Sequence, residues 1–307
     1  MPISQPALII FDVNETLSDM SPLQQRFEEV GLDAREATTW FASLLRDGFA
    51  LIVTGANPSF ASLARGSLEV SLAGHVPEEA LEHAVLHIVD SLSGLGVHDD
   101  VVDGVTALAE QGRRLVTLSN GGTAVAEALF AAAGIRDRFQ QLLTVEDAPR
   151  WKPDQEAYHY ALRCCELDEP DEAMLVAVHP WDIEGARSAG LSTAWINRSG
   201  ARYPAYFGQP DLEVTSVLDL ARQLVSGPAR DRLSTPTVRR WSAARCACPP
   251  RVRGDEAGPR RGGAPRPGGS QDLSASREVD PIDVGGWFGA SPDRPSGQEG
   301  RDRRRLG

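Results

Sequence analysis

Three short apolar runs, each followed at once by polar residues, are the feature that most limits how this chain can fold. The runs cover residues 7–11, 114–118 and 174–178, and they lead into Asp12, Ser119 and His179. A short apolar run beside turn-forming residues is typical of a strand buried on both faces of a parallel sheet. Because ligands of open α/β sheets bind beside the carboxyl ends of the strands, these polar residues should meet in one pocket.

The sequence contains a single lysine, Lys152, among 31 lysine and arginine residues. The arginine side chain is a planar fork, whereas lysine carries a compact charge that fits between two carboxylates in a narrow pocket. Asp12 and Asp182 both follow predicted strands, so the same pocket should receive them and Lys152. Lys152 could also be an ordinary surface residue in an arginine-rich sequence, but the motifs around it favour a functional role.

Five segments resemble the haloacid dehalogenase superfamily in order and spacing. They are FDVNETL (11–17), LSNGG (118–122), WKPDQEAY (151–158), HPWDIEGARSAGL (179–191) and AWINRSG (194–200). More narrowly, they are similar to the type II 2-haloacid dehalogenase branch, and the resemblance covers roughly residues 7–225. It implies an α/β fold with a doubly wound, Rossmann-like parallel sheet and an inserted helical cap.

Apolar periodicity and charge divide the chain into three parts. The core domain is expected at residues 1–18 and 104–226, and helical spacing without strand-like alternation predicts a helical cap at residues 19–103. Residues 227–307 are rich in Gly, Pro and Arg and show no apolar periodicity. Such a segment buries too little apolar surface to offset the entropy of ordering, so it is predicted to be a disordered tail.

Composition also limits the location and the partners of the protein. The sequence has no apolar run of about 18 residues and no basic leader before an apolar stretch, which favours a cytoplasmic protein that does not bind membranes. The net charge is −12, and the charges of the basic tail are mixed, so we expect no nucleic-acid partner. A homodimer is expected from the resemblance alone.

The resemblance implies covalent catalysis by Asp12. An ionised carboxylate at a strand end can displace a leaving group and form an ester, which divides one difficult step into two easier ones. Lys152 would keep Asp12 ionised by lowering its pKa. Asp182 would hold Lys152 from the other side or position the water that attacks the ester. No cofactor and no metal are expected.

A small anionic molecule is the expected substrate. Ser119 and Asn120, with the amides of the two glycines that follow, offer hydrogen bonds to an anionic group at a predicted helix start. The same two side chains could instead cap that helix. Thr16, Tyr158 and Trp181 also match the family pattern and are expected to bond to the site or contact the substrate.

Position 14 separates two possible reactions. In the phosphatase branches the residue two after the nucleophile is an Asp that protonates the leaving alkoxide, whereas Asn14 cannot give up a proton near neutral pH. Glu15 should point away from this direction. A halide needs no acid, so we expect hydrolysis of short 2-haloacids to 2-hydroxyacids. A Mg²⁺-dependent phosphatase acting on a small phosphorylated metabolite and a non-catalytic binding module are the alternatives.

The sequence departs from the family pattern at two places. An Arg that helps to bind the halide follows the cap Trp by two residues in the family, but here the second residue after Trp40 is Ala42. Arg46, one helical turn further on, is the candidate replacement. Ala177 and His179 replace small polar residues that orient the hydrolytic water. His179 could act as the base for ester hydrolysis or could pack beneath the pocket.

Overall fold

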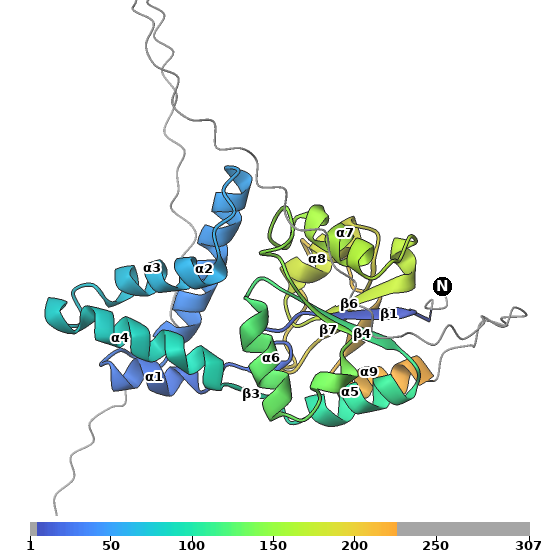
Figure 1. Ribbon diagram of the computed structural model, residues 1–307, viewed down its shortest axis with the longest axis horizontal. Helices are drawn as coiled ribbons and strands as arrows, with labels where there is room; N and C mark the ends of the chain where they lie inside the picture. Colours follow the sequence, from blue (N-terminus) through green and yellow to red (C-terminus); the bar gives the residue numbers. More distant parts are fainter. Residues whose placement is uncertain (1–4, 226–307) are drawn as a thin grey trace, which may run out of the picture. The chain divides into compact units, whose positions relative to one another are not determined.

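A computed structural model describes residues 5–225, which form a parallel sheet, the helices beside it and a helical insertion (Figure 1). The strands of the sheet are β1 (Leu8–Phe11), β4 (Arg114–Ser119), β5 (Gln141–Thr144), β6 (Ala173–Ala177), β7 (Ser192–Ile196) and β8 (Leu212–Val214). Their order is β5-β4-β1-β6-β7-β8, and each neighbouring pair is parallel. The chain moves outward from β1 in one direction and then in the other, so the carboxyl end of β1 lies at the topological switch point. The predicted disordered tail lies outside the described residues.

Alternate residues of the strands face two separate cores. Leu8 and Ile10 of β1 pack with α7 (Gln155–Cys164) and α8 (Pro180–Ser188), and Figure 1 shows these helices on one face of the sheet. Ile9 and Phe11 pack on the other face, against a second set of helices. That set comprises α5 (Val101–Glu110), α6 (Thr123–Ala132) and α9 (Val217–Val225). Burial of both faces explains the uninterrupted apolar runs, and it confirms the predicted doubly wound α/β fold.

The helical insertion consists of α1 (Leu23–Glu29), α2 (Glu36–Val53), α3 (Phe60–Leu72), α4 (Glu78–Ser91) and the short 3₁₀ turn η1 (Leu92–Gly94). An antiparallel pair, β2 (Ser18–Asp19) and β3 (Gly96–Val97), joins it to the sheet domain. The expected boundary between the insertion and the core, at residue 103, falls inside α5. This helix packs against α9 of the sheet domain, so α5 belongs to that domain. Two further 3₁₀ turns, η2 (Arg136–Arg138) and η3 (Pro170–Glu172), lie before β5 and β6.

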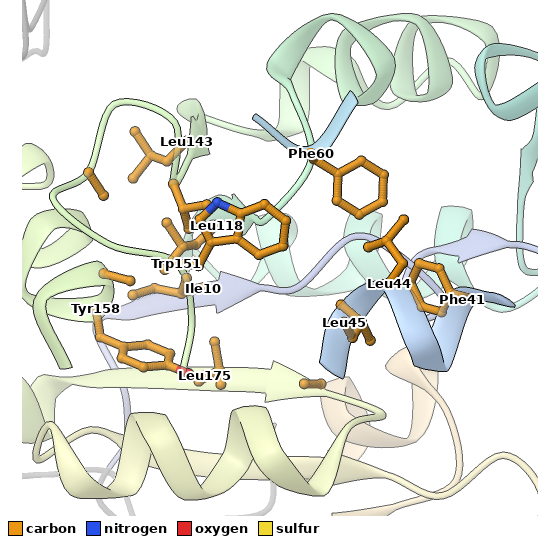
Figure 2. Close-up of a cluster of buried hydrophobic side chains, with 14 of the residues drawn as sticks. Ile10, Phe41, Leu44, Leu45, Phe60, Leu118, Leu143, Trp151, Tyr158 and Leu175 are labelled. Atoms are coloured by element: carbon orange, nitrogen blue, oxygen red, sulfur yellow. The ribbon is translucent and has the colours of Figure 1, made fainter. Parts of the chain in front are cut away.

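Trp151 connects the sheet domain to the helical insertion. Its ring lies close to the sheet residue Leu118 and to Phe60 of α3 in Figure 2, and it stacks on Phe60 with ring centroids 6.1 Å apart. The indole nitrogen donates a hydrogen bond of 3.0 Å to the carbonyl of Pro58. On α2, Gly48 permits this approach, since a Cβ there would lie 2.7 Å from the Trp151 ring. These contacts hold the insertion beside the residue that follows Trp151 in the chain, which is Lys152.

Within the described part of the chain, no helix combines the length and the apolar character needed to cross a membrane.

Candidate active site

A buried ion-pair centre lies at the carboxyl edge of the sheet. The Nζ atom of Lys152 donates hydrogen bonds of 2.9 Å to Oδ1 of Asp12 and 2.6 Å to Oδ2 of Asp182. Asp12 directly follows β1, Asp182 belongs to the first turn of α8, and Lys152 lies between β5 and α7. The side chains of Lys152, Asp12 and Asp182 are 0%, 5% and 0% exposed. The structure therefore brings together the lysine and both carboxylates named in the sequence analysis.

Two further hydroxyl groups satisfy the remaining carboxylate oxygens. Thr16 donates a hydrogen bond of 2.7 Å to Oδ2 of Asp12 and accepts one from the backbone of Val178. Tyr158 donates a hydrogen bond of 2.6 Å to Oδ1 of Asp182. Because the Tyr158 side chain is wholly buried, it acts on Asp182 rather than on a molecule in a cavity. Buried carboxylates need such partners, since an unpaired buried acceptor is costly.

The surroundings shift the pKa values of the two carboxylates in opposite directions. Burial alone would raise the pKa of Asp12, but the charges of Lys152 and His179 and the hydrogen bonds from Lys152 and Thr16 lower it below its usual value. Burial also raises the pKa of Asp182, and the charge of Asp12 adds to this effect against the opposing influence of Lys152. The pKa of Lys152 is raised, because the two carboxylates outweigh its burial. The centre thus favours the ionised form of Asp12.

Asn120 supports the backbone of Lys152. Its side-chain nitrogen donates to the carbonyl of Lys152 at 3.3 Å, and its side-chain oxygen accepts from the amide of Lys152 at 3.1 Å. Ser119 accepts a hydrogen bond of 2.9 Å from the amide of Gly121, and α6 begins after Gly122 as its cap residue. Ser119 lines a cavity, whereas both polar groups of the Asn120 side chain bond to Lys152.

His179 lies on the other side of Asp12, immediately before α8. Its Nε2 atom is 3.2 Å from the carbonyl oxygen of Asn14 and 3.6 Å from Oδ2 of Asp12. The same nitrogen is 3.6 Å from Oε2 of Glu15. The imidazole stacks on the ring of Trp181 with centroids 5.0 Å apart, so it is held on one face. A single nitrogen of His179, Nε2, therefore faces three oxygen atoms, those of Asn14, Asp12 and Glu15.

Glu15 is the functional candidate that the sequence analysis missed. Its φ of 59° places it in the left-handed region, and its carbonyl contacts Nε2 of His98 at 3.0 Å. This turn directs the carboxylate toward His179, although alternation along an extended chain predicted the opposite direction. Burial raises the pKa of Glu15, and the Asp12 charge acts in the same direction while His179 and His98 oppose it. No residue type in the motif signals such a turn.

The structure does not bring Arg46 to the other site residues. The buried face of α2 consists of apolar residues and Gly48, and Arg46 falls on the opposite, exposed face. Its guanidinium bonds to Asp47 at 2.8 Å. Trp181, by contrast, lies close to the centre, with its ring centroid 5.9 Å from Nζ of Lys152. The spacing of one helical turn from Ala42 was therefore insufficient to place Arg46 in the site.

Two cavities flank the centre. One of about 570 Å³ is lined by Glu15, His179 and Arg198 among others, and one of about 330 Å³ is lined by Asn14 and Ser119 at the sheet edge and by α3 and α4. Among residues 5–225, no group of three or more His, Cys, Asp and Glu side chains is arranged to hold a metal ion. The arrangement can supply an ionised carboxylate, a fixed cation beside it and a histidine on its other flank.

Comparison with known proteins points to one family. Over 130 residues the chain is 35% identical to an (S)-2-haloacid dehalogenase of Pseudomonas sp. (strain YL), which covers 42% of this chain and 56% of that protein. It is 28% identical to haloacetate dehalogenase H-2 of Moraxella sp. (strain B) over 47% of this chain and 64% of that protein. The matches therefore span less than two thirds of both relatives. An (S)-2-haloacid dehalogenase of Pseudomonas putida is 25% identical over 71% of this chain and 96% of its own length.

Solved structures and a family model agree with these relatives. The L-2-haloacid dehalogenase from Xanthobacter autotrophicus has a TM-score of 0.64 at 22% identity, covering 73% of this chain and 100% of that chain. A defluorinating L-2-haloacid dehalogenase has a TM-score of 0.63 at 26% identity, covering 72% and 96%. These names agree with the type II branch. Because residues 6–190 match the model described as haloacid dehalogenase-like hydrolase, the chain belongs to the haloacid dehalogenase-like hydrolase family.

Proposed function

We propose that this protein hydrolyses the carbon–halogen bond of a 2-haloacid and releases the 2-hydroxyacid and the halide. The observation that carries the proposal is the Asp12 carboxylate, which is buried and whose pKa is lowered beside Lys152. Position 14, two residues further, holds an Asn that cannot protonate a leaving group. The names of the Pseudomonas relatives support the same reaction.

In the first step, an oxygen of Asp12 attacks C2 of the substrate. A new carbon–oxygen bond forms, and the carbon–halogen bond breaks with its electron pair leaving on the halide. Lys152 steadies the carboxylate until it is consumed, and Thr16 helps to fix its orientation at 2.7 Å. Water must be scarce here for the carboxylate to react, and the burial of Asp12 provides that condition. The product of the step is an ester on Asp12.

In the second step, water attacks the carbonyl carbon of the ester. His179 accepts a proton from that water, the bond between the Asp12 carbonyl carbon and the substrate oxygen breaks, and the departing alkoxide takes the proton from His179 to become the 2-hydroxyacid. Glu15, whose Oε2 lies 3.6 Å from Nε2 of His179, can stabilise the imidazolium that forms. The second proton of the water is left on the Asp12 carboxyl group and passes to solvent, which restores the carboxylate. Asp182 holds Lys152 through both steps, so its role is to position the cation.

Substrate contacts complete the proposal. The Ser119 hydroxyl lines the cavity beside Asp12 and is the proposed partner of the substrate carboxylate. Trp181 is the proposed apolar contact beside Lys152, since its ring stacks on His179 and its centroid lies 5.9 Å from Nζ of Lys152. Asn120 contributes indirectly, through the backbone of Lys152. The cytoplasmic location and the homodimer stay predictions.

Halide release tests the proposal directly. The purified protein should release chloride from L-2-chloropropionate, and EDTA should leave the rate unchanged. A parallel assay uses p-nitrophenyl phosphate with Mg²⁺ as a general phosphatase substrate. Phosphate release without halide release would support the phosphatase alternative. Absence of both activities, in protein that is folded by circular dichroism, would favour a binding module.

A further inference from the structure

The cavity of about 330 Å³ lies between the helical insertion and the sheet edge, and Val13 and Asn14, which directly follow Asp12 in the chain, belong to its lining. Asn14 and Ser119 form the polar end of this cavity. Gly121 lies close to both side chains, since a Cβ there would be 3.3 Å from the Ser119 hydroxyl and 3.7 Å from the Asn14 amide nitrogen. From this end the cavity is bounded by Phe60 and Ala64 on α3 and by Val125 on α6. A molecule held at Asp12 therefore has apolar space beside it.

The lining of this cavity is suited to an apolar group. Most of its remaining lining residues are aliphatic or aromatic, and Ala61 and Ala64 leave room on the α3 side. Glu146 is the only charged side chain among the residues that line it, and its Oε2 would be 3.8 Å from a Cβ on Gly122. A hydrocarbon chain inside the cavity would gain from leaving water.

The size of the cavity exceeds what the smallest chiral 2-haloacid requires. An engineered apolar cavity of about 150 Å³ in another protein binds benzene, so about 330 Å³ can receive a chain of roughly four carbons or more. The methyl group of 2-chloropropionate would leave most of it unfilled. An unfilled apolar cavity forfeits contacts that a longer substrate would make.

We propose that this cavity binds the side chain at C2, so that the preferred substrates are 2-haloacids with an unbranched apolar chain of about four carbons. This inference rests on the proposed function and specifies its substrate class. The substrate carboxylate stays at the Ser119 end, C2 faces Asp12, and the chain extends between α3 and α6. Ala64 and Val125 are then specificity-determining residues.

Kinetics on two substrates test the inference. Each buried methylene contributes roughly a fourfold gain in kcat/KM, so 2-chlorohexanoate should exceed 2-chloropropionate by at least about tenfold. Halide release is measured for both acids over a range of concentrations. A kcat/KM that is equal for the two acids, or that falls with chain length, would overturn the inference while leaving the dehalogenase reaction intact.

Variants that fill the cavity provide the second arm. Ala64→Leu, on α3, should lower the ratio of kcat/KM for 2-chlorohexanoate over 2-chloropropionate toward one, and Val125→Phe should do the same from the α6 side. The matched control is Ala50→Leu, which makes the same change at an exposed position of α2 and should keep the wild-type ratio. If both cavity variants keep the wild-type ratio and the wild-type melting temperature, the chain of the substrate does not lie in this cavity.

Binding of halogen-free acids separates failure of the inference from failure of the proposed function. Titration calorimetry compares hexanoate with propionate on the wild-type protein and on Ala64→Leu. Tighter binding of hexanoate that Ala64→Leu removes would support the cavity assignment even if no acid releases halide. Equal affinity for the two acids would overturn it, whatever the halide assay shows.

Discussion

The sheet edge and the helical insertion contribute different kinds of side chain to the site. At the sheet edge, Lys152 bonds to both Asp12 and Asp182 in a buried cluster. From the insertion, Phe60 and Ala64 contribute apolar surface. The charged groups are held by the ends of parallel strands, so the geometry of the sheet sets their distances. The insertion can change the size of the pocket without disturbing them, which separates the chemistry from the choice of substrate.

The largest effect is expected where the sheet edge supplies the nucleophile. Asp12→Asn should lower kcat by roughly 10⁴-fold or more, because a neutral amide cannot form the ester. The melting temperature should change little, since Lys152 and Asp182 still pair at 2.6 Å. Halide release and thermal unfolding measure the two quantities. Retained turnover in this variant would refute the assignment of Asp12 as the nucleophile and would indicate that the reaction takes place away from the sheet edge.

Removal of the lysine should damage stability as well as activity. Lys152→Met leaves two buried carboxylates without their cation, which should lower the free energy of unfolding by about 3–5 kcal/mol and abolish turnover. Urea denaturation measures the loss. In the double variant Lys152→Met/Asp182→Asn, part of the stability should return, because only one buried charge remains. A single variant as stable as wild type would show that the cluster is not held as tightly as its distances indicate.

A smaller loss should follow when the support of Asp182 is removed. Tyr158→Phe deletes the donor of the 2.6 Å hydrogen bond to Asp182 and should lower the free energy of unfolding by about 1–3 kcal/mol. The control is Tyr206→Phe, which removes a hydroxyl from a largely exposed side chain and should have no effect. Equal unfolding free energies for both variants would mean that water or another donor replaces the Tyr158 hydroxyl.

The pH dependence tests the electrostatics of the sheet edge. Since the folded-state pKa of Asp12 lies below that of an unfolded Asp at about 3.9, its contribution to stability is present above that value and is lost as the pH falls through the lower, folded value. The same ionisation should keep Asp12 reactive down to about pH 4. Profiles of kcat/KM and of unfolding free energy between pH 3 and pH 8 test both statements. An acid limb of kcat/KM near pH 6 would assign control to a different group.

The smallest effect is expected on the exposed face of the insertion. Arg46→Ala removes a guanidinium that pairs with Asp47 in solvent, so kcat/KM should stay within about twofold of wild type. A loss of tenfold or more, together with weaker inhibition by chloride, would show that the insertion closes further during turnover and brings Arg46 to the halide.

Sequence reasoning succeeded where periodicity and strand ends determine position. The predicted apolar runs coincide with β1, β4 and β6 to within a residue or so, because buried parallel strands admit few polar side chains. Convergence of Asp12 and Asp182 followed from the same rule, since parallel strands present their carboxyl ends at one edge. Lys152 could be included because it is the single lysine of the chain.

Sequence reasoning failed where the position of a side chain depends on a local turn or on tertiary contacts. Glu15 reaches His179 through one left-handed residue, which no spacing rule anticipates. Arg46 lies one helical turn after Ala42, yet α2 buries its apolar face and Gly48, which leaves Arg46 exposed. The Asn120 side chain was expected to face a ligand, but its amide bonds to the backbone of Lys152. Such pairings join segments far apart in the sequence and require the fold itself.

Because the single lysine is wholly buried, its chemical labelling would report when the site becomes exposed to solvent. Reagents that acylate primary amines need solvent access to an uncharged nitrogen, and the folded chain denies Lys152 both conditions. The rate of acylation at this position, measured by mass spectrometry of one peptide, would therefore report how often the helical insertion and the sheet edge separate. Few proteins of this size allow such a reading without removing competing lysines first.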